Sequence, residues 1–109
     1  MSSIHPSKYR VIITQRAFSS IIECAEFVNN VSESSSTTLK ELMLNSIKTL
    51  NEFPNRYPEI ENLLIRNKKV RKMPIDGGRY MVIYIVDADY VEICNVIDCR
   101  RNNTFIKIM

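Results

Sequence analysis

The stretch "RYMVIYIVDADYVEICNVIDCRRN", residues 79–102, carries the strongest structural signal in the chain. Two apolar runs, rich in β-branched and aromatic residues, flank the short acidic segment "DAD", and this pattern predicts a β-hairpin. The first run, "RYMVIYIV", is too apolar for a strand with one face in water, so we expect it in the middle of a sheet. The second run ends in the paired arginines Arg100 and Arg101. The basic end of this hairpin is therefore a candidate binding surface, where one arginine would face a partner and the other would brace the chain end against Asp98.

The residues before the hairpin predict a strand followed by two amphipathic helices. "YRVIIT", residues 9–14, is short and β-branched, and Thr14 is a suitable N-cap for a helix over residues 16–31. A second helix is expected up to residue 53, where Pro54 would stop it. The two predicted apolar stripes comprise Phe18, Ile21, Ile22, Ala25 and Val28 in the first helix and Leu39, Leu42, Met43, Ile47, Leu50 and Phe53 in the second.

Thr38 and Glu41 fit a capping box at the start of the second helix, with an earlier start left open. Residues 54–67, which contain two prolines, predict an irregular connection. "KKVRKMPI", residues 68–75, predicts a strand at or near a sheet edge, because Pro74 cannot donate a ladder hydrogen bond. Residues 102–109 would form either a further edge strand or a docked segment.

The expected order is therefore β-α-α-β-β-β, in a single domain spanning residues 1–109. This order predicts an α+β fold, with a mainly antiparallel sheet and a helical hairpin packed on one face. No apolar run approaches the roughly 20 residues of a membrane span, and the first ten residues lack a signal peptide's apolar stretch. We therefore expect a cytoplasmic protein that does not bind a membrane.

Few residues are suited to metal binding or nucleophilic catalysis. The chain has three cysteines, no CxxC pair and a single histidine, His5. This inventory argues against a metal site, and also against a Cys–His or Ser–His nucleophile. We expect three reduced thiols and no cofactor.

The charge is unevenly distributed along the chain. Residues 1–65 carry six basic and seven acidic side chains, whereas residues 66–109 carry nine basic and five acidic ones. The "RNKKVRK" segment, residues 66–72, is the densest basic stretch. The asymmetry favours an acidic or anionic partner at the C-terminal half. Alternatively, the lysines are solvated residues of a sheet edge that prevent it from pairing with another chain.

The ordered set of elements resembles the RelE/ParE superfamily, the toxins of bacterial toxin–antitoxin pairs that include plasmid-stabilising systems. "YRVIIT" with "RAFSSIIECAEFV" is similar to the family's first strand and helix, and "LNSIKTLNEFPNRYPE" resembles the end of its second helix. "VRKMPI", "RYMVIYIV" and "VEICNVIDCRRN" resemble its later strands with the basic residues that follow them. The resemblance covers roughly residues 9–103.

The resemblance implies a toxin that arrests growth and is neutralised by a cognate antitoxin. ParE-like members poison DNA gyrase, whereas RelE-like members cleave mRNA on the ribosome with basic residues and, in many members, a C-terminal tyrosine or histidine. Here Met81 follows Tyr80 where nuclease members often have arginine, and only Phe105 follows Arg101 in place of a tyrosine or histidine. We therefore favour gyrase as the target. The alternatives are a ribosome-dependent nuclease and an inactive module that only binds an antitoxin, so whether the chain is an enzyme stays open.

The resemblance assigns basic residues to three roles. Arginine binds phosphate or carboxylate with two parallel hydrogen bonds but is a poor base. Arg79 would replace the missing arginine at Met81, because a shift of two residues along a strand keeps the same face. Asp87 and Asp89 flank a turn and are not expected to be catalytic. The expected target-binding residues are Arg71, Lys72, Arg79, Arg100 and Arg101, of which Arg71, Arg79 and Arg101 would be the catalytic candidates in a nuclease, and the expected antitoxin-binding residues are Lys68, Lys69 and Arg71.

Overall fold

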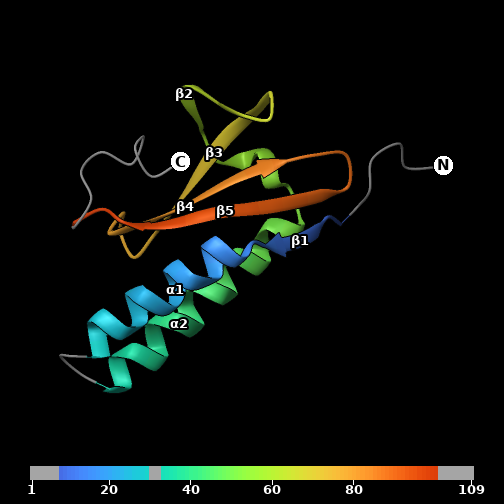
Figure 1. Cartoon of the computed structure of the whole chain (residues 1–109). Coiled ribbons are helices and arrows are strands. Elements are labelled where there is room, and N and C mark those ends of the chain that lie inside the picture. Colours follow the sequence, from blue (N-terminus) through green and yellow to red (C-terminus); the bar gives the residue numbers. More distant parts are fainter. Residues whose placement is uncertain (1–7, 30–32, 101–109) are drawn as a thin grey trace.

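The computed structural model describes residues 8–29 and 33–100 (Figure 1). These residues form one five-stranded sheet with two α-helices on one side of it. The elements in chain order are β1 (Arg10–Ile13), α1 (Gln15–Asn29), α2 (Glu33–Lys48), the 3-10 turns η1 (Thr49–Asn51) and η2 (Pro54–Arg56), β2 (Glu59–Ile65), β3 (Lys68–Ile75), β4 (Tyr80–Val86) and β5 (Tyr90–Asp98).

The strands lie in the order β1-β5-β4-β3-β2, so β4 is the central strand, as its composition predicts. The β2–β3, β3–β4 and β4–β5 pairs are antiparallel, whereas β1 is parallel to β5. The expected α+β fold, with a mainly antiparallel sheet and a helical hairpin on one face, is confirmed. In the described part of the chain, no helix is long and apolar enough to cross a membrane.

Thr14 begins α1 and also ties it to the sheet. Its hydroxyl oxygen accepts a 3.1 Å hydrogen bond from the Ala17 amide, which satisfies one of the free donors at the helix start. The same hydroxyl donates a 2.7 Å hydrogen bond to the Ile93 carbonyl of β5. The predicted N-cap is therefore confirmed, and it fixes the angle at which the helical hairpin leaves β1.

The second helix begins at the earlier of the two positions that the sequence left open, and it ends earlier than predicted. It begins at Glu33, so Thr38 lies inside the helix and does not cap its start. It ends at Lys48, five residues before the expected position, and the chain continues through η1 and η2. The Thr49 hydroxyl donates to the Ser46 carbonyl at 2.6 Å, which uses one of the acceptors that a helix leaves free at its C-terminus.

Strand β2 corrects the expected irregular connection over residues 54–67. It pairs antiparallel with β3, although the register shifts between Glu59 and Leu64. Asn62, at φ 63°, lies within this irregular part. Because β2 forms the sheet edge, β3 is the second strand from that edge. Within β3, Pro74 lies opposite Met81 of β4.

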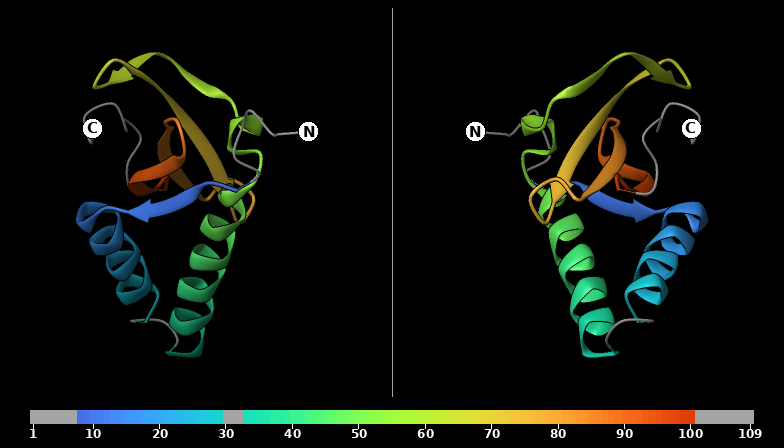
Figure 2. Two further views of the ribbon diagram at one scale, coloured as in Figure 1. Left: turned by 90° about the vertical axis from the view of Figure 1, so that its right-hand side faces the viewer. Right: turned by 90° about the vertical axis from the view of Figure 1, so that its left-hand side faces the viewer.

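Two apolar clusters lie on opposite faces of the sheet. The larger one packs both helices against the sheet, and Tyr80 and Tyr84 are buried in it as expected. The smaller one contains strand residues only and includes Ile83, Ile85 and Ile97, packed against side chains of β2. β2 arches over the side of the sheet away from the helices (Figure 2). Three residues of the predicted stripes are not core: Phe18 is 46% exposed, Leu42 is 41% exposed and Phe53 is 80% exposed.

Candidate binding surfaces

Arg100, at the basic end of the β4–β5 hairpin, is bound to an aspartate of its own chain. Its backbone amide donates a 3.0 Å hydrogen bond to Asp98 Oδ1, and its Nε lies 3.6 Å from the same oxygen. The Asp98 side chain is almost fully buried, so Arg100 compensates its charge. A contact between this arginine pair and Asp98 was expected and is confirmed for Arg100. Arg101 lies outside the described residues.

Arg79 lies in the turn between β3 and β4, next to the same end of the sheet. Its guanidinium is 3.4 Å from Asp76 Oδ2, and its carbonyl accepts a 2.9 Å hydrogen bond from the Cys99 amide. Both Arg79 and Arg100 lower the pKa of Tyr80, but burial and the nearby Asp98 raise that pKa more strongly. The structure therefore brings these two arginines together around Tyr80.

A pocket of about 340 Å³ opens beside Arg79. Arg79 is thus on the helix side of the sheet, whereas Met81 packs in the cluster on the opposite face. The expectation that Arg79 replaces an arginine at Met81 on the same face is wrong, because Arg79 belongs to a turn and not to the strand. The pocket is lined by Val28, Thr38, Leu39, Leu42, Asp76, Arg79 and Tyr80.

The basic residues of β3 are paired with acidic residues of the same chain. Lys69 and Arg71 both contact Glu59 of β2, with Nζ–Oε1 and Nη2–Oε2 distances of 3.5 and 3.2 Å. Lys68 Nζ lies 3.2 Å from Asp87 Oδ2. The three residues expected to attract an acidic antitoxin tail therefore have partners within the chain, which weakens the net field of this edge.

Lys72 lies on the face opposite Arg71, since successive side chains of a strand alternate. It is partly buried, and its charge lowers the pKa of Cys99, although burial raises that pKa overall. Arg71 lies opposite Tyr84 of β4. Arg79 and Arg100 lie near Tyr80, which precedes Tyr84 by four residues, about 13 Å along the strand. The expected target-binding residues are therefore distributed over two faces and about half the length of the sheet.

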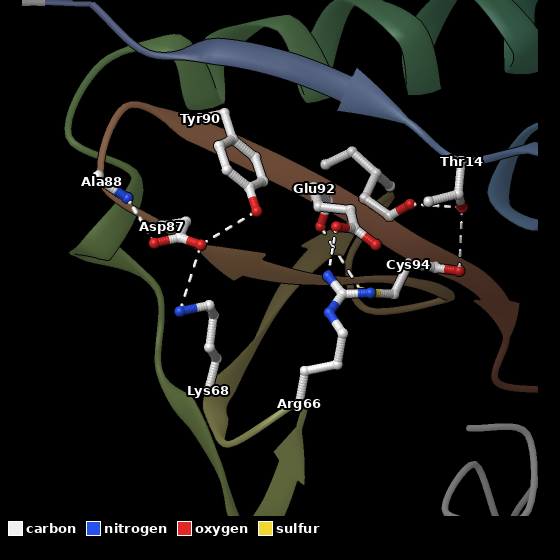
Figure 3. A network of polar contacts seen from close by, with 9 residues as sticks. Thr14, Arg66, Lys68, Asp87, Ala88, Tyr90, Glu92 and Cys94 are labelled. Atoms are coloured by element: carbon white, nitrogen blue, oxygen red, sulfur yellow. Dashed lines mark hydrogen bonds and ion pairs between the residues drawn. The ribbon is translucent and has the colours of Figure 1, made fainter.

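A polar network joins the β2–β3 turn to β5 (Figure 3). Arg66, in the left-handed conformation at φ 48°, extends its guanidinium to Glu92 Oε1 at 2.5 Å. Asp87 accepts hydrogen bonds from the Ala88 amide and the Tyr90 hydroxyl and also pairs with Lys68, and these contacts lower the pKa of its carboxyl group. The network holds the β2–β3 hairpin over the sheet, and Asp87 serves in it as an ionised acceptor.

Arg71 also holds the segment between α2 and β2, a role the sequence did not indicate. Its Nη1 donates to the carbonyls of Tyr57 and Asn55 at 2.6 and 3.1 Å, and its side chain is only 19% exposed. From the central strand, the Tyr84 hydroxyl donates a 2.6 Å hydrogen bond to the Pro54 carbonyl. Burial raises the pKa of Tyr84 to about 12.

Arg56 fixes the same segment from its outer side. Its Nη1 donates to the carbonyls of Glu52 and Phe53 at 2.6 and 3.1 Å, and its Nη2 donates to Thr49 Oγ1 at 2.9 Å. The guanidinium carbon also lies 4.9 Å from the centre of the Tyr57 ring, which is within cation–π range. We call residues 49–58 the aromatic loop, because Phe53 is exposed at its bend.

The cysteines are free thiols, and their positions do not suit nucleophilic chemistry. Cys24 is buried, and burial raises the pKa of Cys94 to about 11. A thiol with such a pKa is almost entirely protonated near neutral pH, so it is a weak nucleophile. Among the residues that the structure describes, no three His, Cys, Asp or Glu side chains gather in a way that would hold a metal ion.

The fold and these surfaces can be compared with known proteins. The chain is similar to a solved structure described as the chromosomal ParDE TA system from P. aeruginosa, with a TM-score of 0.69 and 11% sequence identity. The match covers 85% of this chain and 98% of that chain. No family model and no curated protein matches the chain. At this identity the likeness shows the fold, and the chain therefore has the RelE/ParE-like fold expected from its sequence.

Proposed function

We propose that this chain is the toxin of a toxin–antitoxin pair, held inactive by an antitoxin and acting on a cytoplasmic target. The observation that carries the proposal is the fold likeness to the ParDE structure, which extends over 85% of the chain at a TM-score of 0.69. The first strand, the two helices and the later strands follow one another in the order on which the sequence resemblance rests.

Within this class, we propose that the target is DNA gyrase and not mRNA on the ribosome. Cleaving RNA through its 2′-hydroxyl requires a base for that hydroxyl and an acid for the leaving oxygen. Tyr80 and Tyr84 are buried with raised pKa values, and the Tyr90 hydroxyl donates to Asp87. The only histidine of the sequence is His5, in a part that the structure does not describe. This chemistry favours a toxin that acts by binding.

The proposed target surface is the end of the sheet at Arg79 and Arg100, continued by Arg101. The side chains of Arg79 and Arg100 are each 47% exposed, so each can contact a partner while it stays paired with its aspartate. Arg71 is not part of this proposal, because its guanidinium is used within the chain. The antitoxin would cover the β2–β3 edge, where Lys69 is 70% exposed, and the apolar pocket between the helices and the β3–β4 turn.

The test is to incubate the purified chain with gyrase and supercoiled DNA, and separately with ribosomes translating a defined mRNA. A gyrase poison traps cleaved DNA that is released as linear plasmid on denaturation, and it leaves the mRNA intact. Cleavage of the mRNA at regular codon positions, with gyrase unaffected, would instead establish the nuclease function. Activity in neither assay, together with binding to an antitoxin, would identify an inactive module.

A further inference from the structure

Phe53 combines two unfavourable features that rarely occur together. Its backbone is in the left-handed conformation, at φ 49° and ψ 52°, which is an outlier for a bulky residue. Its side chain is 80% exposed, the highest value among the large apolar residues that the structure describes as exposed. Glycine or asparagine would adopt this backbone more readily and would expose no apolar surface. The folded state therefore gives no reason for phenylalanine at this position.

The surrounding residues hold this arrangement in place. The Phe53 carbonyl is bound by Arg56, and the next carbonyl, that of Pro54, is bound by Tyr84. The Phe53 carbonyl also accepts a 3.2 Å hydrogen bond from the Arg56 backbone amide. An outlying backbone that the neighbouring structure fixes so fully is a reason to suspect function. A backbone fixed in advance also loses little conformational freedom when a partner binds its side chain.

The chemistry around the ring favours a protein partner over a nucleic acid. A single strand would need the exposed ring for stacking and nearby cations for its phosphates. The nearest guanidinium, that of Arg56, already donates to three backbone carbonyls and the Thr49 hydroxyl. An aromatic side chain surrounded by polar residues is instead the usual anchor of a protein interface. The complementary surface is an apolar recess large enough for a phenyl ring.

Phe53 also lies apart from the pocket assigned to the antitoxin. The pocket involves Thr38, Leu39 and Leu42 of α2, whereas Phe53 follows the opposite end of that helix. Leu42 and Lys48 are six residues apart, about 9 Å along the helix axis, and the chain continues beyond Lys48 to reach Phe53. The aromatic loop borders the β2–β3 edge, because Arg71 of β3 binds the carbonyls of Asn55 and Tyr57, so the test must also measure antitoxin binding.

We propose that Phe53 is a preorganised anchor that inserts into an apolar recess on the protein target of the toxin. The inference rests on the proposed function and adds to it a contact residue that is neither basic nor catalytic. It adds the aromatic loop, which lies away from the pocket assigned to the antitoxin, to a target surface whose Arg79 borders that pocket.

The test is the variant Phe53→Asn, with Phe53→Gly as a second variant and Phe18→Ala as the matched control. Phe18 is 46% exposed on α1, where the backbone is helical, so its loss removes similar apolar surface without changing a strained position. We expect Phe53→Asn to keep or raise the melting temperature and to lose growth arrest. Phe18→Ala should arrest growth as the wild type does. Loss of a central interface anchor corresponds to about 30-fold weaker binding or more.

Three outcomes overturn the inference and leave the proposed function intact. Full growth arrest by both Phe53 variants would remove the residue from the target surface. Failure of Phe53→Asn to co-purify with the protein encoded by the neighbouring reading frame, when the wild type does, would assign Phe53 to the antitoxin interface. Binding of the wild type to a single-stranded oligonucleotide, abolished in Phe53→Asn, would replace the protein partner by a nucleic acid. A harmless wild type would instead overturn the proposed function, and the inference with it.

Discussion

The Tyr84 hydroxyl, in the centre of the sheet, donates a 2.6 Å hydrogen bond to the Pro54 carbonyl, 30 positions earlier in the chain. Tyr84 is fully buried, and Pro54 directly follows Phe53. The central strand of the sheet therefore fixes the bend that exposes Phe53. This contact connects the core of the sheet to the aromatic loop.

Replacing Tyr84 with phenylalanine removes this hydrogen bond and leaves the rest of the ring in place. We expect a loss of about 1 kcal/mol in the free energy of unfolding, or a melting temperature lower by about 4–8 °C. Tyr90→Phe is the matched control, because its hydroxyl bonds to the partly exposed Asp87 and its loss should stay within about 0.5 kcal/mol. Equal melting temperatures for the two variants would contradict the role given to Tyr84.

Arg71→Ala should destabilise the fold, because it leaves the carbonyls of Asn55 and Tyr57 without their donor. Hydrogen bonds from a charged group contribute about 1.5–3 kcal/mol, so we expect a loss in that range in urea unfolding. Lys69→Ala, at a side chain that is 70% exposed, should change stability by less than about 0.5 kcal/mol. If Arg71→Ala abolished growth arrest at an unchanged melting temperature, Arg71 would belong to the target surface after all.

Stability should fall at alkaline pH because of two buried groups. The pKa of Cys94 is raised to about 11 and that of Tyr84 to about 12, so in both cases folding favours the protonated form. Their contribution is present below the unfolded pKa and is lost as pH rises, from about 9 to 11 for Cys94 and from about 10 to 12 for Tyr84. Urea unfolding at pH 8 and pH 10.5 measures this loss. Cys94→Ala should show a smaller loss than the wild type, and an identical loss in both would contradict the assignment.

Substitutions of Arg100 and Arg101 should differ in their effects on stability and growth arrest. Arg100→Ala removes the guanidinium that lies 3.6 Å from the buried Asp98 carboxylate, so we expect a lower melting temperature. Arg101→Ala should weaken growth arrest with a melting temperature close to that of the wild type, since we propose that Arg101 contacts the target. Full growth arrest by Arg101→Ala would remove that residue from the target surface, and a sharp fall in its melting temperature would make it structural.

The sequence predicted the parts of the fold that depend on regular patterns. The apolar run of β4, the Thr14 cap and the order of the helices and of all strands except β2 follow from local periodicity and capping chemistry. Phe53 was misassigned because it continues the spacing of Leu50, although the helix has already ended at Lys48. The position of that end depends on tertiary contacts, among them the Tyr84–Pro54 hydrogen bond, which no local pattern reveals.

The site was harder to predict for a related reason. β2 escaped detection because its register is irregular and Asn62 adopts a left-handed conformation. Unless β2 is predicted, the sequence gives no reason to place Glu59 beside Lys69 and Arg71. The two cations were therefore interpreted as a binding surface. The contact between Arg100 and Asp98 was foreseen, because two residues at the end of one strand are close in any fold.

Growth of bacteria after induced expression of the intact chain tests the central claim most directly. The account predicts that viable counts stop rising after induction, and that co-expression of the small protein encoded by the neighbouring reading frame restores growth. Growth at the uninduced rate, while the folded chain accumulates without that partner, would contradict it.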